Sequence, residues 1–308
     1  MGDSSPHVTI VILNWNGKNL TLDCLRSLSG LDYPGCDIVV VDNASTDGSV
    51  EAIRRAFPQV HVVENEANLG FSQGNNRGIA YALEQGSDYV LILNNDTLLR
   101  QGGFLSILVA YLEENPGVAA VSPLILYPDS SLVWSAGGRL RIRLGMCSHI
   151  GKNEPAGLFT AREPYEVDYL PGCCLLAGRK AIADVGLLDP DYFLYFEDLD
   201  WCFRAGEKGY RCMVHPVDAI YHIKSGTAGT SGSDKLSPTQ AFFYARNGIL
   251  FARKNLGGVS RAVFIVAQFS VKAVYSLLHM QSPRAALDYA KGLGAGLLPG
   301  GKWDRIAR

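Results

Sequence analysis

Short apolar runs that stop abruptly at polar residues recur through the first 121 residues of the chain. The runs VTIVIL, DIVVV, HVV and YVLIL are followed by four polar clusters: Asn14 to Asn16, Asp42 and Asn43, Glu64 to Asn68, and Asn94 to Asp96. Between the runs, apolar residues recur at helical spacing, as at Leu22, Leu25 and Leu28. Strands that alternate with helices of this length predict right-handed crossovers and a mainly parallel α/β sheet covered on both faces.

The four polar clusters should lie together, because parallel strands point in one direction and end at one edge of the sheet. Ligands of open α/β sheets bind at that edge. Asn and Asp also begin turns, so a single cluster is typical of any strand end. Asp96 offers hard oxygen ligands, which suit magnesium or manganese that already carries the phosphates of a nucleotide.

Composition limits the class of protein. The 308 residues are 47% hydrophobic and carry a formal net charge of -2, which fits one large domain, or one domain with an appendage, and gives no sign of nucleic-acid binding. The seven cysteines form no C-x-x-C pair, and the start MGDSSPH lacks a signal-peptide pattern. We therefore expect a reducing, cytoplasmic location.

The middle of the chain is less regular. Between about Ser122 and Asp168 the pattern loosens into Pro, Gly and Arg, which predicts loops or a hairpin. Two short strands are expected in YRCMV and AIYHIKSGT, and the segment TAGTSGSDK is typical of a mobile loop before a helix near residues 238–255.

Three carboxylates crowd the expected start of a helix in FEDLDWCFRAGEKG. Acidic residues favour a helix N-terminus through its dipole, but Glu197, Asp198 and Asp200 lie within four residues, which is more than that effect requires. Close carboxylates raise one another's pKa and could poise one of them as a general base for a hydroxyl.

Two further residues have competing interpretations. Asp42, in VVVDNASTDGS, could be a phosphorylated nucleophile or belong to a calcium loop, but Ala44 stands where each pattern needs an oxygen ligand. What remains is a carboxylate that accepts hydrogen bonds from the N–H groups of a base.

His222 closes a short strand before a glycine-containing turn, so it is either a ligand for metal or phosphate or a structural histidine.

The segment from Val259 onward is basic and amphipathic. It contains seven Lys or Arg and two Asp, an excess of five positive charges. Helical spacing places two sets of residues on opposite faces: Phe264, Ala267, Val271, Val274 and Leu278 on one, and Arg261, Gln268, Lys272, Ser276 and His279 on the other. Such a segment favours an anionic membrane surface, or equally a helix packed on its own domain or on a second subunit.

Seven sequence blocks occur in an order that carries a resemblance. They are VTIVILNWNG, IVVVDNASTDGS, NEANLGFSQGNNRGI, YVLILNNDT, YLPGCCLLAGRKA, FEDLDWCFRAG and YHIKSGT. From Val8 to about Asn255 the chain resembles a family 2 glycosyltransferase of the type-A, Rossmann-like fold, especially the rhamnosyltransferase-like branch. The resemblance implies a nucleotide-sugar-dependent domain over residues 1–256 and a helical, basic extension over 257–308.

The resemblance also implies an activity and a set of roles. The activity is inverting transfer of a sugar from a UDP- or dTDP-sugar, with dTDP-rhamnose among the candidates, to a hydroxyl of a glycan or lipid-linked acceptor. Asp198 would be the base, and Asp96 and His222 would hold a divalent metal, Mn or Mg. The nucleotide-sugar would be bound by Asn14, Asn16, Asp42, Asn43, Asn68, Gly70, Asn75, Asn94 and Asn95. The acceptor side would include Gly172, Cys173, Glu197, Asp200 and Trp201.

One departure and two alternatives remain. The D-x-D motif of the family appears as Asn94-Asn95-Asp96, so its first carboxylate is an amide. A nucleotidyltransferase would need a Gly-rich, basic loop after the first strand, where this chain has NWNGKN. A non-catalytic nucleotide-sugar binder is the other class, and product analysis separates all three. A lipid-linked acceptor would place the protein at the inner face of the cell membrane.

Overall fold

The structure is a computed structural model that describes residues 5–128, 130–223 and 235–298. Its strands are β1 (Val8–Asn14), β2 (Cys36–Asp42), β3 (His61–Glu64), β4 (Tyr89–Asn94), β5 (Thr97–Leu99), β6 (Val118–Leu126), β7 (Val133–Ser135), β8 (Gly138–Arg141), β9 (Met146–His149), β10 (Tyr165–Val167), β11 (Cys174–Gly178) and β12 (Arg211–His222). Its helices are α1 (Lys18–Leu28), α2 (Ser49–Ala56), α3 (Gly70–Glu84), α4 (Phe104–Glu114), the 3-10 turn η1 (Ile142–Leu144), α5 (Gly157–Thr160), α6 (Arg179–Val185), α7 (Glu197–Glu207), α8 (Pro238–Asn255), α9 (Gly258–Phe269), α10 (Val271–Leu278) and α11 (Pro283–Leu297).

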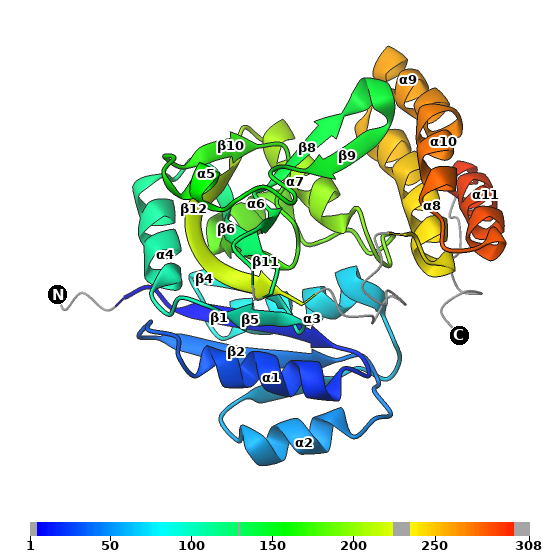
Figure 1. Ribbon diagram of the computed structural model, residues 1–308. Coiled ribbons are helices and arrows are strands. Elements are labelled where there is room, and N and C mark those ends of the chain that lie inside the picture. The colour runs from blue at the N-terminus through cyan, green and yellow to red at the C-terminus, as the bar shows by residue number, and fades with distance from the viewer. Residues whose placement is uncertain (1–4, 129, 224–234, 299–308) are drawn as a thin grey trace.

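One large sheet forms the centre of the molecule, in the order β10-β12-β6-β11-β4-β1-β2-β3. β1 pairs in parallel with β2 and β4, and β2 pairs in parallel with β3, as the alternating pattern predicts. β11 enters antiparallel between β4 and β6, so the second half of the sheet is mixed. Helices flank the sheet, and α8 to α11 form a helical region at one end (Figure 1).

The central strands are continuous apolar runs because both of their faces are buried. Ile10 and Ile12 of β1 belong to the core that contains Leu25 of α1 and Leu108 of α4. The intervening Val11 belongs to the second core, which contains residues of α3. This alternation of side chains across a strand fixes the register of β1 and leaves its polar end at the edge of the sheet.

Two expectations for the middle of the chain need correction. The hairpin is present as β8 and β9, but β6 runs on through Ser122 to Leu126 with all nine residues buried, so this part is core. The two short strands expected after α7 are one strand, β12, whose register against β6 shifts between Val214 and Asp218, near Pro216. Eight residues of the expected loop TAGTSGSDK, 227–234, lie outside the described residues.

The apolar face predicted for the C-terminal helices is only partly buried. Phe264 and Ala267 are buried, but Val274 and Leu278 are 60% and 75% exposed, and Gln268 of the predicted polar face is fully buried. The helix breaks at Ser270, whose φ and ψ are -116° and -87°, and this break changes the direction in which the side chains of α10 point. Gln268 is held inside because its Nε2 donates to the carbonyl of Gly145.

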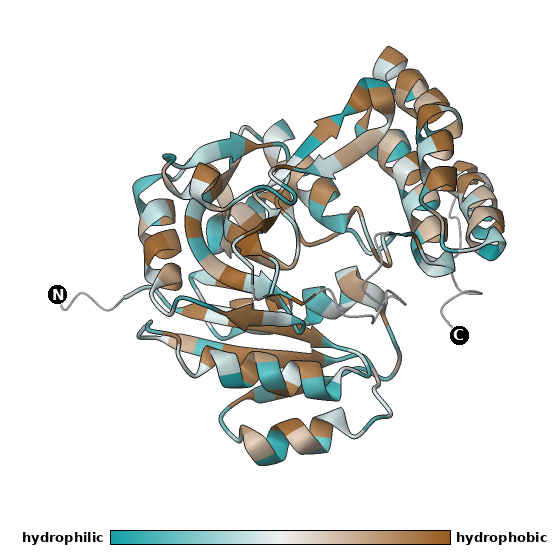
Figure 2. Cartoon of the chain, viewed as in Figure 1, coloured by the Kyte–Doolittle hydropathy of each residue, from teal (hydrophilic) through white to brown (hydrophobic). Residues whose placement is uncertain are grey.

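Hydrophobic residues are frequent both in the central strands and along the C-terminal helices (Figure 2), and several of those in the helices are exposed. Over the described residues, one segment, Gly258–Leu278, is long and apolar enough to cross a membrane by length and composition, and 22% of it is buried. Such a segment alone is weak evidence for a membrane span. It does identify a large apolar surface on α9 and α10.

Candidate active site

The carboxyl ends of β1, β2 and β4 meet at one edge of the sheet. Asn14 lies opposite Asp42 in the register, and Leu13 lies opposite Asn94. The Nδ2 of Asn14 donates to Oδ1 of Asp42 at 2.7 Å, and the backbone N–H of Ser45 donates to Oδ2 of Asp42 at 2.8 Å. These bonds fix the Asp42 carboxylate at the floor of the edge, where the nucleoside contact is predicted.

A second amide network shapes the loop that begins α3. Asn43 donates from Nδ2 to Oδ1 of Asn68 at 3.2 Å and to the carbonyl of Gly70 at 3.0 Å. Gly70 has a φ of 76°, and a Cβ there would lie 2.4 Å from the ring of Phe193. Only glycine fits this turn, which brings the predicted nucleotide-binding residues against the segment that leads into α7.

The other amides predicted to bind nucleotide have different environments. Asn95 is buried and donates to Thr21 Oγ1 at 3.0 Å, so its amide supports the first turn of α1. Asn16 is exposed and accepts a hydrogen bond from the N–H of Thr46. The Oδ1 of Asn75 is buried and makes no hydrogen bond to the described residues. This oxygen can therefore accept a hydrogen bond from a bound ligand.

Asp96 and His222 are brought together by the pairing of β5 with β12. Thr97 lies opposite His222 in this pair, and the backbone N–H of Ile223 donates to the carbonyl of Asp96 at 2.8 Å. Asp96 Oδ1 and His222 Nε2 are 3.1 Å apart, and both residues are buried. The ring of Trp134 contacts His222 edge-on, with ring centroids 4.4 Å apart.

This pair fits a divalent cation that is shared with a substrate. Neither ring nitrogen of His222 makes a hydrogen bond to the described residues, so the imidazole is available as a ligand next to a carboxylate oxygen. Across residues 5–128, 130–223 and 235–298 no group of three or more His, Cys, Asp or Glu could hold a metal by itself. A cation here would therefore complete its coordination with water or substrate oxygens, as magnesium and manganese commonly do.

The turn before α7 has a strained backbone. Tyr195 and Phe196 have φ values of 69° and 77°, a region that costs bulky residues about 1–3 kcal/mol each. Asn247 of α8 stabilises it, because its Nδ2 donates to the carbonyls of Leu194 and Tyr195, both at 2.8 Å. Tyr195 also stacks on Tyr244 with ring centroids 4.4 Å apart. Helix α8 thus holds the strained turn that presents Glu197 and Asp198.

The two carboxyls at the start of α7 differ in their partners. Asp198 accepts hydrogen bonds from the N–H groups of Gly172 at 3.0 Å and Leu199 at 2.7 Å. Burial raises the pKa of Asp198, and these N–H donors oppose the rise. Burial and then the charge of Asp198 hold the pKa of Glu197 well above its usual range, and Glu197 Oε2 has no hydrogen-bond partner among the described residues. The N–H donors therefore favour the ionised form of Asp198, while burial and the neighbouring charge favour the protonated form of Glu197.

Gly172 and Cys173 connect Asp198 to the edge of the sheet. Gly172 donates to Asp198, and the carbonyl of Cys173 accepts the N–H of Asn94 at 3.0 Å. A Cβ on Gly172 would lie 3.2 Å from the ring of Phe71, so the backbone passes close to that ring. The predicted acceptor side and donor side are thereby joined through a single backbone segment.

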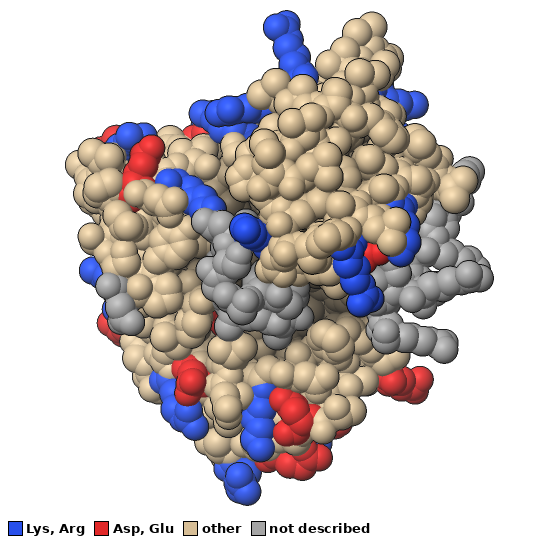
Figure 3. Space-filling view, turned by 45° about the vertical axis from the view of Figure 1, so that its right-hand side comes forward, with Lys and Arg blue, Asp and Glu red and all other residues tan. Residues whose placement is uncertain are grey.

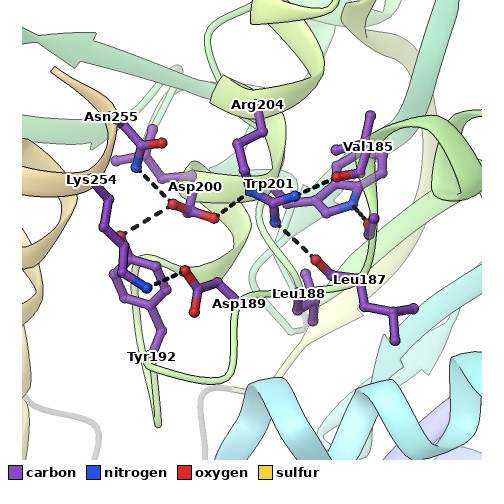
Figure 4. A network of polar contacts seen from close by, with 12 residues as sticks. Val185, Leu187, Leu188, Asp189, Tyr192, Asp200, Trp201, Arg204, Lys254 and Asn255 are labelled. Carbon is purple, nitrogen blue, oxygen red and sulfur yellow. Dashed lines mark hydrogen bonds and ion pairs between the residues drawn. The ribbon is translucent and has the colours of Figure 1, made fainter. Parts of the chain in front are cut away.

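Asp200 and Trp201, which are predicted on the acceptor side, make hydrogen bonds within the protein (Figure 4). Asp200 is 1% exposed and accepts hydrogen bonds from Arg204, Tyr192 and Asn255. The Trp201 indole N–H donates to the carbonyl of Gly186 at 2.8 Å. The contacts of these two side chains hold α7 against α8 and against the segment before Tyr192.

The sequence pattern did not reveal an aromatic series beside His222. Trp134 contacts both His222 and His149, and His149 in turn lies 6.1 Å from the ring of Tyr169. These residues come from β7, β9 and the segment before β11. Their only sequence signal is aromatic content in a region without periodicity, and the sheet topology alone brings them beside His222.

Comparisons with known proteins agree with this geometry. A model of the family described as "Glycosyl transferase family 2" matches residues 9–186. The chain is 32% identical over 230 residues to the N-acetylglucosaminyl-diphospho-decaprenol L-rhamnosyltransferase of Mycobacterium tuberculosis, covering 69% of this chain and 75% of that protein. It is 24% identical over 307 residues to the dTDP-rhamnosyl transferase RfbF of Shigella flexneri, covering 94% and 97%.

The fold is also similar to that of solved glycosyltransferases. The mannosyltransferase PcManGT from Pyrobaculum calidifontis, solved in complex with GDP-Man and Mn2+, superposes with a TM-score of 0.59 at 20% identity and covers 97% of this chain and 78% of its own. This likeness confirms the predicted type-A architecture, a mostly parallel sheet flanked by helices with a helical C-terminal region.

Proposed function

Since this chain belongs to glycosyl transferase family 2, we propose that it transfers a sugar with inversion from a nucleoside diphosphate to a hydroxyl of a glycan or lipid-linked acceptor. One observation carries the proposal. A half-buried carboxylate, Asp198, accepts hydrogen bonds from two backbone N–H groups and is joined through Gly172 and Cys173 to the edge that bears Asp96. The segment Gly172 and Cys173 has the proposed base at one end and the proposed cation site for the diphosphate at the other. This arrangement suits a single displacement at the anomeric carbon.

The proposed donor is a dTDP- or UDP-sugar, with dTDP-rhamnose the first choice. The two relatives described above are named as rhamnosyltransferases, and one of them is named for dTDP-rhamnosyl transfer. In this chain, the Asn14–Asp42 pair and the amides of Asn68 and Asn75 would contact the nucleotide. The donor's base would meet Asp42, whose carboxylate accepts hydrogen bonds.

The mechanism follows from the two carboxyls at the start of α7. Asp198 takes the proton of the acceptor hydroxyl as its oxygen attacks the anomeric carbon from the face opposite the leaving group. The nucleoside diphosphate leaves, and the configuration inverts without a covalent intermediate on the protein. Bound magnesium or manganese, held by Asp96 and His222, would neutralise charge on the leaving diphosphate. Burial favours the protonated form of Glu197, and in that form it adds no second negative charge beside Asp198.

A donor screen tests the proposal. The protein is incubated with nucleotide sugars, with and without manganese or magnesium, and released nucleoside diphosphate is measured. We expect metal-dependent release from one donor. Release of pyrophosphate would indicate a nucleotidyltransferase, and binding without any release would indicate a non-catalytic binder.

We also propose that the C-terminal helices dock on an anionic membrane. The surface over them, at the upper right in Figure 3, is largely uncharged, and the charged side chains around it are mostly Lys and Arg. Val266, Val274, Leu277 and Leu278 are each more than half exposed. An apolar surface with a basic border complements anionic lipid, and a lipid-linked acceptor would be found there.

A further inference from the structure

Trp134 lies beside the predicted cation pair and is partly accessible. It is the middle residue of β7, and strand alternation places it on the side opposite to Val133 and Ser135. Those two residues are fully buried, whereas Trp134 is half-buried. Its ring centroid is 4.4 Å from that of His222, with an interplanar angle of 64°. The accessible part of the indole is therefore next to a residue that is predicted to bind the cation.

The indole N–H of Trp134 is an unused hydrogen-bond donor. It makes no hydrogen bond within the part of the chain that the structure describes. An indole N–H inside a protein usually has a partner, as the N–H of Trp201 has in the carbonyl of Gly186. An aromatic ring with a free donor suits a sugar, because a sugar has apolar C–H faces and hydroxyl oxygens that accept hydrogen bonds.

Trp134, His149 and Tyr169 together form an aromatic wall. The ring centroid of His149 lies 4.5 Å from that of Trp134 and 6.1 Å from that of Tyr169. Ser135 Oγ and His149 Nδ1 share a hydrogen bond of 2.9 Å, which orients the imidazole. Tyr169 is buried against Gly138, where a Cβ would lie 2.0 Å from its ring. These contacts hold the aromatic wall in place.

The far end of the aromatic wall is close to the proposed base. Burial raises the pKa of Tyr169 well above its usual range, and the charges of Cys147 and Asp198 add to the rise. Tyr169 therefore lies within electrostatic range of Asp198, while Trp134 contacts His222 at the other end. The aromatic wall thus extends from the cation pair toward the base.

In a single displacement, the transferred sugar lies between these two ends. Its anomeric carbon is bonded to the diphosphate, which the cation site would hold, and is attacked from the opposite face by the hydroxyl that Asp198 deprotonates. A sugar ring in this place lies alongside the aromatic wall, and the side nearer the diphosphate meets Trp134. The acceptor comes from the side of Asp198 and is nearer to Tyr169.

We propose that Trp134 binds the transferred sugar of the donor, with the indole ring against a C–H face of the sugar and the indole N–H donating to one of its hydroxyls. This inference rests on the proposed function and adds a residue that determines donor specificity. Contact with Trp134 would hold the anomeric carbon in line with the attacking hydroxyl. The indole takes no part in proton transfer.

The test separates the contribution of the sugar to donor binding from that of the nucleotide. Calorimetry with manganese and without acceptor compares dTDP with dTDP-rhamnose, and UDP with UDP-glucose. The proteins are wild type, Trp134→Leu, Trp134→Phe and Tyr111→Leu. Leu removes both the ring and the N–H, whereas Phe removes the N–H alone. Tyr111 is the matched control, because its ring also contacts a histidine edge-on, His215, with ring centroids 5.6 Å apart.

We expect the losses to be confined to the nucleotide sugar that wild type binds. Trp134→Leu should weaken its binding about tenfold, while the affinities for the nucleoside diphosphate and for manganese change less than about twofold. Trp134→Phe should lose about threefold, since it lacks only the hydrogen bond. Tyr111→Leu should bind every ligand as wild type does. If Trp134→Leu does not fold, Trp134→Phe carries the test, and its loss must again be confined to the nucleotide sugar.

Three outcomes would overturn the assignment. Nucleotide-sugar binding could be unchanged in the folded Trp134 variants. Equal losses for nucleotide sugar, nucleoside diphosphate and manganese would mean that the indole only supports His222. A raised KM for the acceptor with unchanged donor binding would place Trp134 on the acceptor side. Failure of wild type to bind or hydrolyse any nucleotide sugar would instead refute the proposed function, so the two failures are distinguishable.

Discussion

Glu197 and Asp198 are adjacent carboxyls with unequal partners; Glu197 is buried and Asp198 is half-buried. Asp198 accepts two backbone N–H bonds, whereas Glu197 has a buried oxygen without a hydrogen bond to the described residues. The folded protein therefore binds a proton at Glu197 more tightly than the unfolded chain does. By linkage, the stability associated with Glu197 is complete below the ordinary pKa of a glutamate and is lost as pH rises through the raised folded value.

Replacing Glu197 by Gln should show this linkage. Gln is neutral at every pH, so the variant avoids the cost of ionising a buried carboxyl. We expect the melting temperature of Glu197→Gln, relative to wild type, to rise between pH 5 and pH 9. A difference that is constant or falls over this range would mean that Glu197 is ionised in the folded protein.

The Asp96–His222 pair gives a second prediction for single residues. Asp96→Asn and His222→Gln keep side-chain size but remove a carboxylate or an imidazole next to the predicted cation. Each should lower the thermal stabilisation by manganese plus nucleoside diphosphate and weaken the apparent affinity for manganese about 10- to 100-fold. His215→Gln is the matched control, since His215 contacts Tyr111 elsewhere. Equal manganese responses in all proteins would exclude the pair as ligands.

Helix α8 lies outside residues 9–186, which the family model matches, and it stabilises the turn before Asp198. Asn247 Nδ2 donates to two carbonyls of that turn, and its Oδ1 accepts from Arg246 at 2.6 Å, which orients the amide. Since Tyr195 and Phe196 are strained, the turn depends on such bonds to keep Asp198 in place.

Asn247→Ala should therefore reduce kcat more than it changes the affinity for donor. We expect a loss of about tenfold or more in kcat, because a displaced base affects the chemical step. Asn255→Ala is the control on the same helix: Asn255 donates to Asp200 at 2.7 Å and does not touch the turn. It should lower stability but leave kcat within about twofold. Equal loss of kcat in both variants would mean that Asn247 stabilises the fold and does not position Asp198.

Elements with a clear hydrophobic period were predictable from the sequence, and elements whose environment depends on distant contacts were not. β1, β2 and β4 are buried on both faces, so their apolar runs identify them and their polar ends. β6 was partly missed because Ser122 and Pro123 interrupt its apolar run, although both are buried.

The candidate site divides in the same way. The polar ends of strands converge at one edge by topology, which is why Asp42 and Asp96 could be placed in advance. The contacts of Asp200 with Arg204 and Asn255 could not, since an acidic residue at a helix start has the same sequence signal whether it faces a cleft or a neighbouring helix. A single helical period assumes that α9 and α10 share one continuous face. The break at Ser270 separates the two faces, so the period could not predict which side chains are exposed.

At the scale of the whole molecule, the surface of α9 and α10 would connect the enzyme to a membrane. Replacing Val274, Leu277 and Leu278 together by Ser removes exposed apolar area without touching the buried face. We expect co-sedimentation with phosphatidylglycerol vesicles to fall at least about tenfold, since each side chain that enters lipid contributes about 1.5–3 kcal/mol. High salt should weaken binding as well, because basic residues border the surface.

Leu158→Ser provides the control, because Leu158 is 54% exposed on α5. Its vesicle binding should equal that of wild type. If the triple variant bound vesicles as wild type does, the membrane contact would lie on another surface of the protein. Loss of binding accompanied by a change from dimer to monomer would instead support the packing of the extension on a second subunit.

The most direct test of the central claim compares wild type with Asp198→Asn in the donor screen with acceptor-containing membrane extract. Wild type should release nucleoside diphosphate from one nucleotide sugar in the presence of manganese. Asp198→Asn should lose about 100-fold or more of that turnover, while its thermal stabilisation by the same donor is unchanged. Turnover equal to wild type in Asp198→Asn, or release of pyrophosphate in place of nucleoside diphosphate, would contradict the account.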